Sequence, residues 1–386
     1  MKLALLDQGE FLGGAEHFLI DLLNHLTDHE IQRFNPVIWG GTSASYTSKL
    51  SKKISRENFF YPPVRGNKIQ QFFHLFRLAK CGFLLQKKSK TSGITHFFSN
   101  TPRTHFAMLF SRILAGNSLP WYAYFHDFTI PPFLLRRIGK SADFLLANGV
   151  PTRQYLRSHV RPEDVSKIRI IENGFDTDSI PISTPPKQIN RILMLGRIDP
   201  RKGQIYALET AHLLQERNPD VSFHIVGSPV ESDERTIQYA KELQKKSAEY
   251  GLKNLTFESE TSSPLEKITQ YDAVLVLPTE PETFGRIVVE ALVLGRLVFV
   301  FNETGPREII RNFERFIQQQ EGMSPYQFDK IPTLLVESKN PMSLAETIGF
   351  FADHPTEAEI YLRHAQSFVA KNFSITETKK RFLNLF

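Results

Sequence analysis

The segment Pro278-Thr-Glu-Pro-Glu-Thr-Phe-Gly-Arg-Ile-Val-Val-Glu-Ala291 decides the fold, together with the apolar run Ala273–Leu277 that precedes it. Such a run is typical of a buried strand in a parallel sheet. Gly285 then opens a helical stretch, so the segment predicts strand, loop and helix in succession. In open α/β sheets, ligands bind beyond the carboxyl ends of the strands, and helix N-termini favour anionic ones.

Two carboxylates in this segment stand eight positions apart, Glu282 in the loop and Glu290 in the helix. The helical stretch around Glu290 is otherwise apolar, and a carboxylate there is costly unless something pairs with it. Glu290 is therefore either a buried structural acceptor or a ligand contact. We expect both carboxylates to face one polar pocket.

Apolar strand-like runs alternate with helical periodicity along the whole chain, which predicts an α/β class with parallel sheets. A length of 386 residues favours two domains. The Pro- and Ser-rich stretch 176–190 is the expected linker. We predict Rossmann-like domains at residues 1–180 and 181–370 that face a cleft, and a terminal helix at 371–386 that packs back across the hinge. The expected strands are Lys2–Leu6, Asn35–Ile38, Ile94–Phe98, Trp121–Phe125, Phe144–Ala147, Ile168–Ile171, Ile192–Leu195, Ser222–Val226, Leu255–Phe257, Ala273–Leu277 and Leu297–Phe301.

Composition narrows the function classes. The single cysteine, Cys81, excludes an internal disulfide and a Cys-based zinc site. The apolar run at the N-terminus is too short for a signal peptide, and no stretch reaches the roughly 18 apolar residues of a membrane span. We therefore expect a cytoplasmic protein. No nucleic-acid module is recognisable, so nucleic acid is not an expected partner.

Charge is unevenly distributed. Residues 1–180 contain 23 Lys and Arg against 14 Asp and Glu, and the remainder has 24 against 27. A basic half suggests an anionic partner, a membrane surface or an acidic polymer, although an uneven surface without function is an equal alternative. Residues 65–90 combine Phe and Leu with Lys and Arg, so they could form a basic amphipathic helix on an anionic membrane. Core packing of this helix is the favoured alternative.

Other candidate site residues follow predicted strands. Gly13 and Gly14 precede a helix, where glycines let the backbone approach a ligand, although a tight turn explains them equally. Arg197 and Lys202 follow the first strand of the second half, and two cations there suit a diphosphate; Arg201 could serve instead. His126 follows Trp121–Phe125 and could bind a sugar hydroxyl or a phosphate, but a lone histidine is more often structural. Gly305-Pro306-Arg307-Glu308 is expected as a further turn into a helix.

Together, Gly13-Gly14, His126, Gly196-Arg197 with Lys202-Gly203, and the Glu282/Glu290 pair resemble the retaining GT-B glycosyltransferases of glycosyltransferase family 4. The order and spacing match over nearly the whole chain, and the glutamate pair around Phe284-Gly285 is the most specific element. The resemblance implies that Arg197 and Lys202 hold a donor diphosphate, aided by amides near Gly14 and in Thr283–Arg286. Glu290 would bind the ribose, Glu282 the donor sugar and His126 its 6-position. Members usually need no metal or other cofactor.

The same resemblance implies a retaining transfer in which the leaving phosphate accepts the acceptor's proton. The expected donor is a UDP-sugar, and the expected acceptor is a glycan or lipid-linked molecule of the cell envelope. Two departures stand out: residues 311–333 form a longer excursion than in most relatives, and Arg286 replaces an aliphatic residue, where it could add a phosphate contact. A sugar-nucleotide epimerase and a catalytically silent GT-B binding protein are the alternatives.

Overall fold

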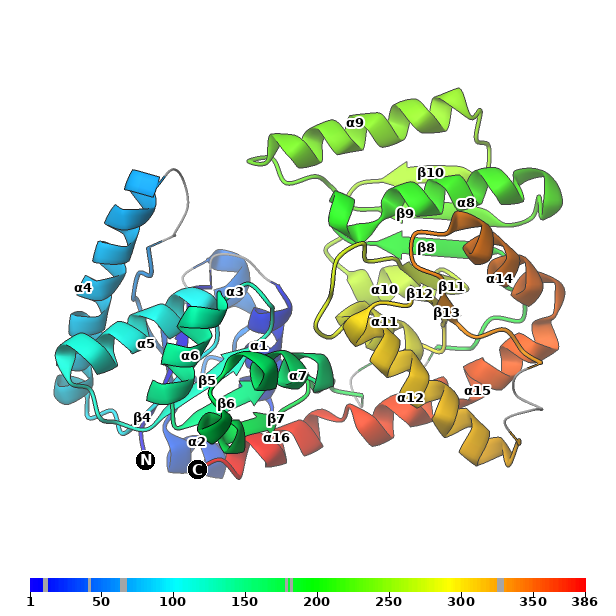
Figure 1. Ribbon diagram of the computed structural model, residues 1–386. Helices are drawn as coiled ribbons and strands as arrows, with labels where there is room; N and C mark the ends of the chain where they lie inside the picture. Colours follow the sequence, from blue (N-terminus) through cyan, green and yellow to red (C-terminus); the bar gives the residue numbers. More distant parts are fainter. Residues whose placement is uncertain (10–12, 41–42, 63–67, 178–179, 181–182, 325–329) are drawn as a thin grey trace. The chain divides into compact units, whose positions relative to one another are not determined.

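A computed structural model describes residues 1–9, 13–40, 43–62, 68–177, 180, 183–324 and 330–386. The chain divides into two compact units (Figure 1). The N-terminal unit contains Met1–Asp176 and Phe373–Phe386, and the C-terminal unit contains Thr177–Asn372.

The N-terminal unit is built on a seven-stranded parallel sheet with the strand order β3-β2-β1-β4-β5-β6-β7. Helices cover both faces of this sheet. Its strands are β1 (Leu3–Asp7), β2 (Val37–Gly40), β3 (Ser55–Glu57), β4 (His96–Ser99), β5 (Trp121–Phe125), β6 (Phe144–Ala147) and β7 (Ile168–Ile170). Its helices are α1 (Gly14–Asn24), α2 (Asp28–Phe34), α3 (Ala44–Lys49), α4 (Lys68–Ser92), α5 (Pro102–Ala115), α6 (Pro132–Ser141), α7 (Val150–His159), the 3-10 helix η1 (Pro162–Lys167) and α16 (Ile375–Leu383).

Two apolar clusters fill the two sides of this sheet. One joins the strands to α4, α5, α6 and α7, and the other joins them to α1 and α16. In α4, Leu78, Cys81 and Leu85 face the first cluster. A Cβ atom on Gly82 would lie 2.6 Å from the Ser111 backbone nitrogen, so the glycine lets α4 pack directly on α5.

The C-terminal unit has a six-stranded parallel sheet with the strand order β10-β9-β8-β11-β12-β13. Its strands are β8 (Arg191–Leu195), β9 (Ser222–Val226), β10 (Leu255–Glu258), β11 (Ala273–Val276), β12 (Leu297–Phe301) and β13 (Leu335–Val336). Its helices are the 3-10 helix η2 (Pro200–Lys202), α8 (Gln204–Arg217), α9 (Glu234–Glu249), α10 (Pro264–Thr269), α11 (Arg286–Val293), α12 (Thr304–Glu321), α14 (Pro341–Asp353) and α15 (Pro355–Asn372).

The expected strands are all present, and the terminal helix is present as α16. Two strands were missed. β3 is Ser-Arg-Glu at the sheet edge and carries no apolar residue, while β13 has only two residues. The predicted excursion at 311–333 is helical in its first part, because residues up to Glu321 continue α12 on an amphipathic pattern that buries Phe313 and Ile317. Residues 325–329 of that stretch lie outside the described residues.

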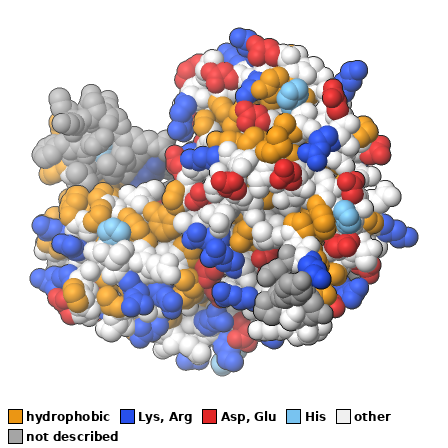
Figure 2. Space-filling view, turned by 45° about the vertical axis from the view of Figure 1, so that its right-hand side comes forward, with side chains coloured by type: hydrophobic (Ala, Val, Ile, Leu, Met, Phe, Trp, Pro, Cys, Tyr) orange, Lys and Arg blue, Asp and Glu red, His pale blue; other side chains and the backbone are white. Residues whose placement is uncertain are grey.

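The predicted linker holds no helix or strand among its described residues. Arg296, buried after α11, donates to the carbonyl oxygens of Thr184 (2.7 Å) and Thr269 (2.9 Å). These hydrogen bonds attach the end of the linker to the C-terminal unit. Among the helices described, none is long and apolar enough to cross a membrane. Acidic and basic side chains are interspersed with apolar ones on the face seen in Figure 2.

Candidate active site

The C-terminal sheet brings several strand ends together through glycines with positive φ whose Cβ atom would clash with a neighbouring backbone. Gly227, after β9, has φ +158°, and a Cβ atom there would lie 1.9 Å from the carbonyl oxygen of Gly196, after β8. Gly203 has φ +80°, and its Cβ would lie 2.1 Å from the Leu277 carbonyl oxygen, after β11. The loops that follow β8, β9 and β11 are therefore in backbone contact at one sheet edge.

Arg201 is held by a buried neighbour. Its guanidinium donates to both carboxylate oxygens of Asp199, Nε to Oδ1 at 3.0 Å and Nη2 to Oδ2 at 2.6 Å. This bidentate contact holds the pKa of Asp199 at about 2. The sequence left open whether Arg201 binds a phosphate; its pairing with Asp199 orients it in the η2 turn, and its side chain stays 46% exposed.

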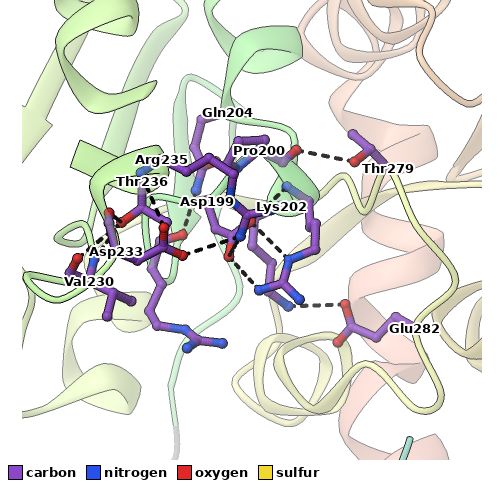
Figure 3. A network of polar contacts seen from close by, with 12 residues as sticks. Asp199, Pro200, Lys202, Gln204, Val230, Asp233, Arg235, Thr236, Thr279 and Glu282 are labelled. Carbon is purple, nitrogen blue, oxygen red and sulfur yellow. Dashed lines mark hydrogen bonds and ion pairs between the residues drawn. The ribbon is translucent and has the colours of Figure 1, made fainter. Parts of the chain in front are cut away.

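Lys202, the next residue, points toward the loop before α11 (Figure 3). Its Nζ atom lies 3.1 Å from Oε2 of Glu282, with both side chains partly exposed. Thr279 also joins the two loops. Its backbone nitrogen donates to the Arg201 carbonyl oxygen (2.9 Å), and its hydroxyl donates to the Pro200 carbonyl oxygen (3.1 Å). Residues 80 positions apart thus form one cation–carboxylate pair at the sheet edge.

The other side of the Glu282 loop rests on the start of α12. The Gly305 nitrogen and the Thr304 hydroxyl both donate to the Glu282 carbonyl oxygen, at 2.8 and 2.5 Å. A Cβ atom on Gly305 would lie 2.5 Å from the carbonyl carbon of Thr283. Gly305 therefore lies inside the first turn of α12, as the predicted helix entry required, and its lack of a side chain lets α12 fix the backbone that carries Glu282.

Glu290 has its own partner on α11. Arg286 Nε lies 2.7 Å from Glu290 Oε1, and the two side chains are only 22% and 12% exposed. This pair answers how the apolar helix tolerates a carboxylate. However, Arg286 occupies the first turn of α11, where the helix macrodipole disfavours a cation. A bound anion at this helix terminus would remove that disadvantage.

The remaining predicted donor-site residues differ in exposure. Phe284 is buried, so it can offer a ligand only its backbone, and Gly285 caps α11 with φ +90° beside Pro306. Arg197 is exposed after β8, and its carbonyl oxygen accepts from Gln204 Nε2 at 2.8 Å. This hydrogen bond fixes the Arg197 backbone and leaves its guanidinium on the surface.

A cavity of about 240 Å³ lies where β9 and β10 end, beside Ile198. Sequence reasoning missed it, although Gly227 directly after a buried strand was a usable signal. The volume is smaller than that of a typical whole-ligand site and suits one part of a ligand, such as a nucleobase. Its lining is Ile198, Gly227, Ser228, Pro229, Ala240, Leu243, Gln244, Phe257, Glu258 and Ser259. A larger hollow of about 570 Å³ beside Arg311 and Arg315 of α12 shares none of these residues.

The other predicted residues lie in the N-terminal unit. Gly13 caps α1, and its backbone nitrogen donates to Glu16 Oε2 at 3.0 Å. Neither Gly13 nor Gly14 has a positive φ, so the backbone conformation alone does not require glycine there. A Cβ on Gly14 would meet no atom within 4 Å. Residues 10–12, which lead into this turn, lie outside the described residues.

His126 belongs to a buried polar network at the carboxyl ends of β1, β4 and β5. Asn100 Nδ2 donates to Asp7 Oδ2 (2.9 Å), so Asn100 Oδ1 accepts from His126 Nε2 (2.8 Å). Burial lowers the pKa of His126 to about 3, which keeps the imidazole neutral at pH 7. Burial and the nearby Glu16 raise the pKa of Asp7. Sequence reasoning missed Asp7 and Asn100, although each is a polar residue at the end of a buried strand.

The structure thus pairs the predicted residues in a way the sequence did not foresee. Lys202 is joined to Glu282 and Arg286 to Glu290, while Gly13, Gly14 and His126 belong to the other unit. Within the part of the chain that the structure describes, no group of three or more His, Cys, Asp or Glu side chains could hold a metal ion.

Known structures resemble the chain over its whole length. HepE from Anabaena, in complex with UDP and glucose, has a TM-score of 0.76 at 19% identity, covering 100% of this chain and 99% of its own. A glycosyltransferase from Rickettsia africae has the same score and identity, covering 100% and 97%. Sucrose-phosphate synthase from Thermosynechococcus elongatus has a TM-score of 0.75 at 15% identity, covering 100% and 98%. These likenesses and the two parallel sheets define the GT-B fold.

Residues 176–366 match the family described as Glycosyl transferases group 1. The match spans nearly all of the C-terminal unit, which carries both cation–carboxylate pairs. No curated protein sequence matches the chain. The family match and the fold together support a GT-B glycosyltransferase.

Proposed function

We propose that this protein is a retaining GT-B glycosyltransferase of family 4 that moves a sugar from a UDP-sugar to a glycan or lipid-linked acceptor. The observation that carries the proposal is the pairing of Lys202 with Glu282 and of Arg286 with Glu290 at one edge of the C-terminal sheet. A nucleotide-sugar offers the matching chemistry, because it has a dianionic diphosphate and two sets of hydroxyl groups.

Donor binding would separate Lys202 from Glu282, because each would bind a different part of the donor. The diphosphate takes the positive charge of Lys202 and of the exposed Arg197, and it adds negative charge near the first turn of α11. The Glu282 carboxylate then accepts hydroxyl groups of the transferred sugar, and Glu290 accepts those of the ribose. Arg286 remains close enough to orient the Glu290 carboxylate, so it acts as a positioning residue.

The transfer itself would need charge stabilisation more than a side-chain base. The bond between the anomeric carbon and the diphosphate oxygen breaks, and the acceptor hydroxyl oxygen bonds to the same face of that carbon. The acceptor proton passes to the departing diphosphate oxygen. Lys202 and Arg197 stabilise the charge that develops on the leaving group. The neutral His126 suits a contact with the sugar 6-position, and the proposed reaction uses no metal or other cofactor.

Support for a UDP-sugar comes from HepE, whose structures contain UDP, UDP-glucose, or UDP and glucose. The cavity beyond β9 and β10 is the proposed place for the base. The N-terminal unit would bind the acceptor. We place the enzyme in the cytoplasm, at the inner face of the membrane, in the biosynthesis of cell-envelope polysaccharide or glycolipid.

A thermal-shift panel of UDP, GDP, ADP and their sugars tests the donor assignment. A ligand at about 100 times its Kd stabilises the folded protein by about 2.7 kcal/mol, so the cognate nucleotide should stand out. We expect UDP and UDP-sugars to raise Tm, and Glu290→Ala to weaken the effect. A shift with GDP or ADP alone would contradict the UDP assignment.

Product analysis separates the reaction classes. Incubation with the stabilising nucleotide-sugar should release UDP in proportion to glycosylated acceptor, with the anomeric configuration of the donor retained. An epimerised nucleotide-sugar formed without any acceptor would favour an epimerase. Stabilisation with neither transfer nor hydrolysis would favour a silent binding protein.

A further inference from the structure

Residues 58–126 contain nine Lys and Arg and no Asp or Glu. This segment runs from the end of β3 to the end of β5 and includes α4 and α5. The whole chain carries a net charge of only +6, so the excess of positive charge is concentrated here. Carboxylates outside the segment pair with two of these cations, Glu57 with Lys88 and Asp143 with Arg112. The segment itself supplies none to neutralise the others, which favours a positive local field on the α4–α5 side of the N-terminal unit.

The outer face of α4 is also unusually apolar for a surface. Phe73, Phe76 and Phe83 are 61%, 68% and 51% exposed, and Leu84 is 47% exposed. These residues recur at helical spacing opposite the buried side that packs on α5. The sequence favoured core packing for this helix. The structure corrects that expectation for its outer side, where large apolar groups face solvent.

Basic side chains lie on the same face. Arg77 and Lys80 are exposed between Phe76 and Phe83, and Lys87 is exposed one turn beyond Phe83; none of the three has a carboxylate partner within the described residues. Lys88, by contrast, pairs with Glu57 at 2.7 Å. Arg77 lies over the ring of Phe60, 6.0 Å from its centroid, and Phe60 is itself 61% exposed.

We propose that this α4 outer face, formed by Phe73, Phe76, Arg77, Lys80, Phe83, Leu84 and Lys87, docks on the surface of an anionic lipid bilayer. From Phe73 to Lys87 the face is about 21 Å long at the rise of an α-helix. Its Phe and Leu side chains enter the headgroup–acyl boundary, while Lys and Arg extend their charged ends to lipid phosphates. The helix therefore lies in the plane of the membrane surface and does not span it.

Two other occupants fit the face less well. A second copy of this chain would bring two positive faces together without carboxylates to neutralise them. A soluble polyanion would bind the cations, but it would gain nothing from four exposed apolar side chains. An anionic bilayer uses both features, since it presents negative charge above an apolar interior.

The role of this docking surface rests on the proposed function, because docking would bring the N-terminal unit to a lipid-linked acceptor in the membrane. Lipid binding itself can be measured without donor, acceptor or transfer. Failure of the glycosyltransferase assignment would therefore leave the docking surface testable.

The test is co-sedimentation of the full chain with vesicles of phosphatidylglycerol and phosphatidylcholine, or of phosphatidylcholine alone, at low salt. We expect binding to the anionic vesicles only, and a fall as salt rises. Both F73S/F76S/F83S and R77Q/K80Q/K87Q should lose about tenfold or more in affinity. The substituted side chains are exposed, so folding is expected to persist. Met342→Ser and K241Q/K245Q, exposed positions on α14 and α9, are the matched controls and should bind like the wild type.

Three outcomes would overturn the proposal: no wild-type binding to anionic vesicles, equal binding by the aromatic variant, or equal binding to vesicles without anionic lipid. A wild-type dimer that the aromatic variant dissociates would assign the face to a second copy instead. UDP thermal shifts on the same variants serve as the independent readout. They should equal the wild-type shift, and absence of any UDP shift beside normal vesicle binding would reject the donor assignment alone.

Discussion

At the level of single residues, the proposed sugar transfer depends most on Lys202 and Glu282. Lys202→Ala removes charge stabilisation of the leaving diphosphate, and Glu282→Ala removes the carboxylate that holds the sugar. We expect each to lower kcat by about 10²–10³-fold, as for other preorganised electrostatic groups. Glu290→Ala should instead raise the Kd for UDP. Steady-state kinetics and calorimetric titration measure the two effects.

A suitable control is Lys245→Ala, which removes an exposed cation that lies 3.6 Å from Glu249 on α9. Surface pairs of this kind contribute little, so activity and stability should remain close to wild type. Near-normal turnover in Lys202→Ala or Glu282→Ala would contradict the site assignment.

Asp199 makes stability depend on pH. Its pKa in the folded protein is about 2, below the ordinary value of 3.8, so folding favours the ionised form. The resulting stabilisation, about 2 kcal/mol, is complete above pH 4 and is lost as pH falls toward 2. Asp199→Asn should therefore lower the free energy of unfolding at pH 7 by about this amount, and the difference from wild type should shrink between pH 4 and 2.

Urea denaturation across that pH range checks the Asp199 prediction. Asp220→Asn, at an exposed position before β9, is the comparison and should change stability little. A difference between Asp199→Asn and wild type that persists undiminished at pH 2 would mean that the stabilisation does not come from the carboxylate charge.

At the level of elements, the close approach of the start of α8 to the end of β11 depends on Gly203. A side chain there would clash with the Leu277 carbonyl oxygen, and the residue that carries it would have to adopt a positive φ. Gly203→Ala should destabilise the C-terminal unit by about 2 kcal/mol or more and should reduce UDP binding, because the loop carrying Lys202 must move. Thermal unfolding and UDP titration measure both effects.

Gly251→Ala is the matched control for this element. Gly251 has φ +59°, but a Cβ atom there would meet nothing within 4 Å. Its cost should be limited to backbone strain of about 1 kcal/mol, with UDP affinity unchanged. Equal losses in the two variants would show that steric contact with Leu277 is unimportant.

At the level of the whole molecule, the chain returns to its first unit at the very end. Phe175 and Ser374 form a parallel β-bridge, and Phe382 of α16 is buried in the cluster around Phe98. Tyr122 also donates through its hydroxyl to the Leu385 carbonyl oxygen at 3.0 Å. The C-terminal 14 residues are therefore part of the N-terminal core and not an appendage.

Phe382→Ala should consequently destabilise the N-terminal unit by about 3–5 kcal/mol, the usual cost of emptying a buried aromatic site. Calorimetry of the full chain should show the change in a transition that UDP does not raise, because UDP is proposed to bind the other unit. Phe73→Ala, at an exposed position of α4, should leave both transitions nearly unchanged. A loss confined to the UDP-sensitive transition would contradict the division of the chain.

Much of the architecture could be predicted because buried parallel strands appear in the sequence as continuous apolar runs, such as Ala273–Leu277. β3 could not, because an edge strand such as Ser55–Glu57 is paired through its backbone and carries no apolar signal. In the site, Glu282, Glu290, Arg197 and Lys202 were named from spacing and strand ends. The Lys202–Glu282 pair was not predictable, since it depends on which loops meet at the sheet edge. Arg286 and Glu290, by contrast, are an i,i+4 pair on one helix, which their spacing could have indicated.

The sequence by itself determined the α/β class, the order of the apolar strands, and the residue types available at each of their ends, because these follow from local periodicity and glycine placement. Only the tertiary structure decided that Lys202 meets Glu282 and that α4 turns Phe73, Phe76 and Phe83 toward solvent. These facts depend on contacts between residues far apart in the chain, and side-chain charge and exposure are set by such contacts and not by neighbours in sequence.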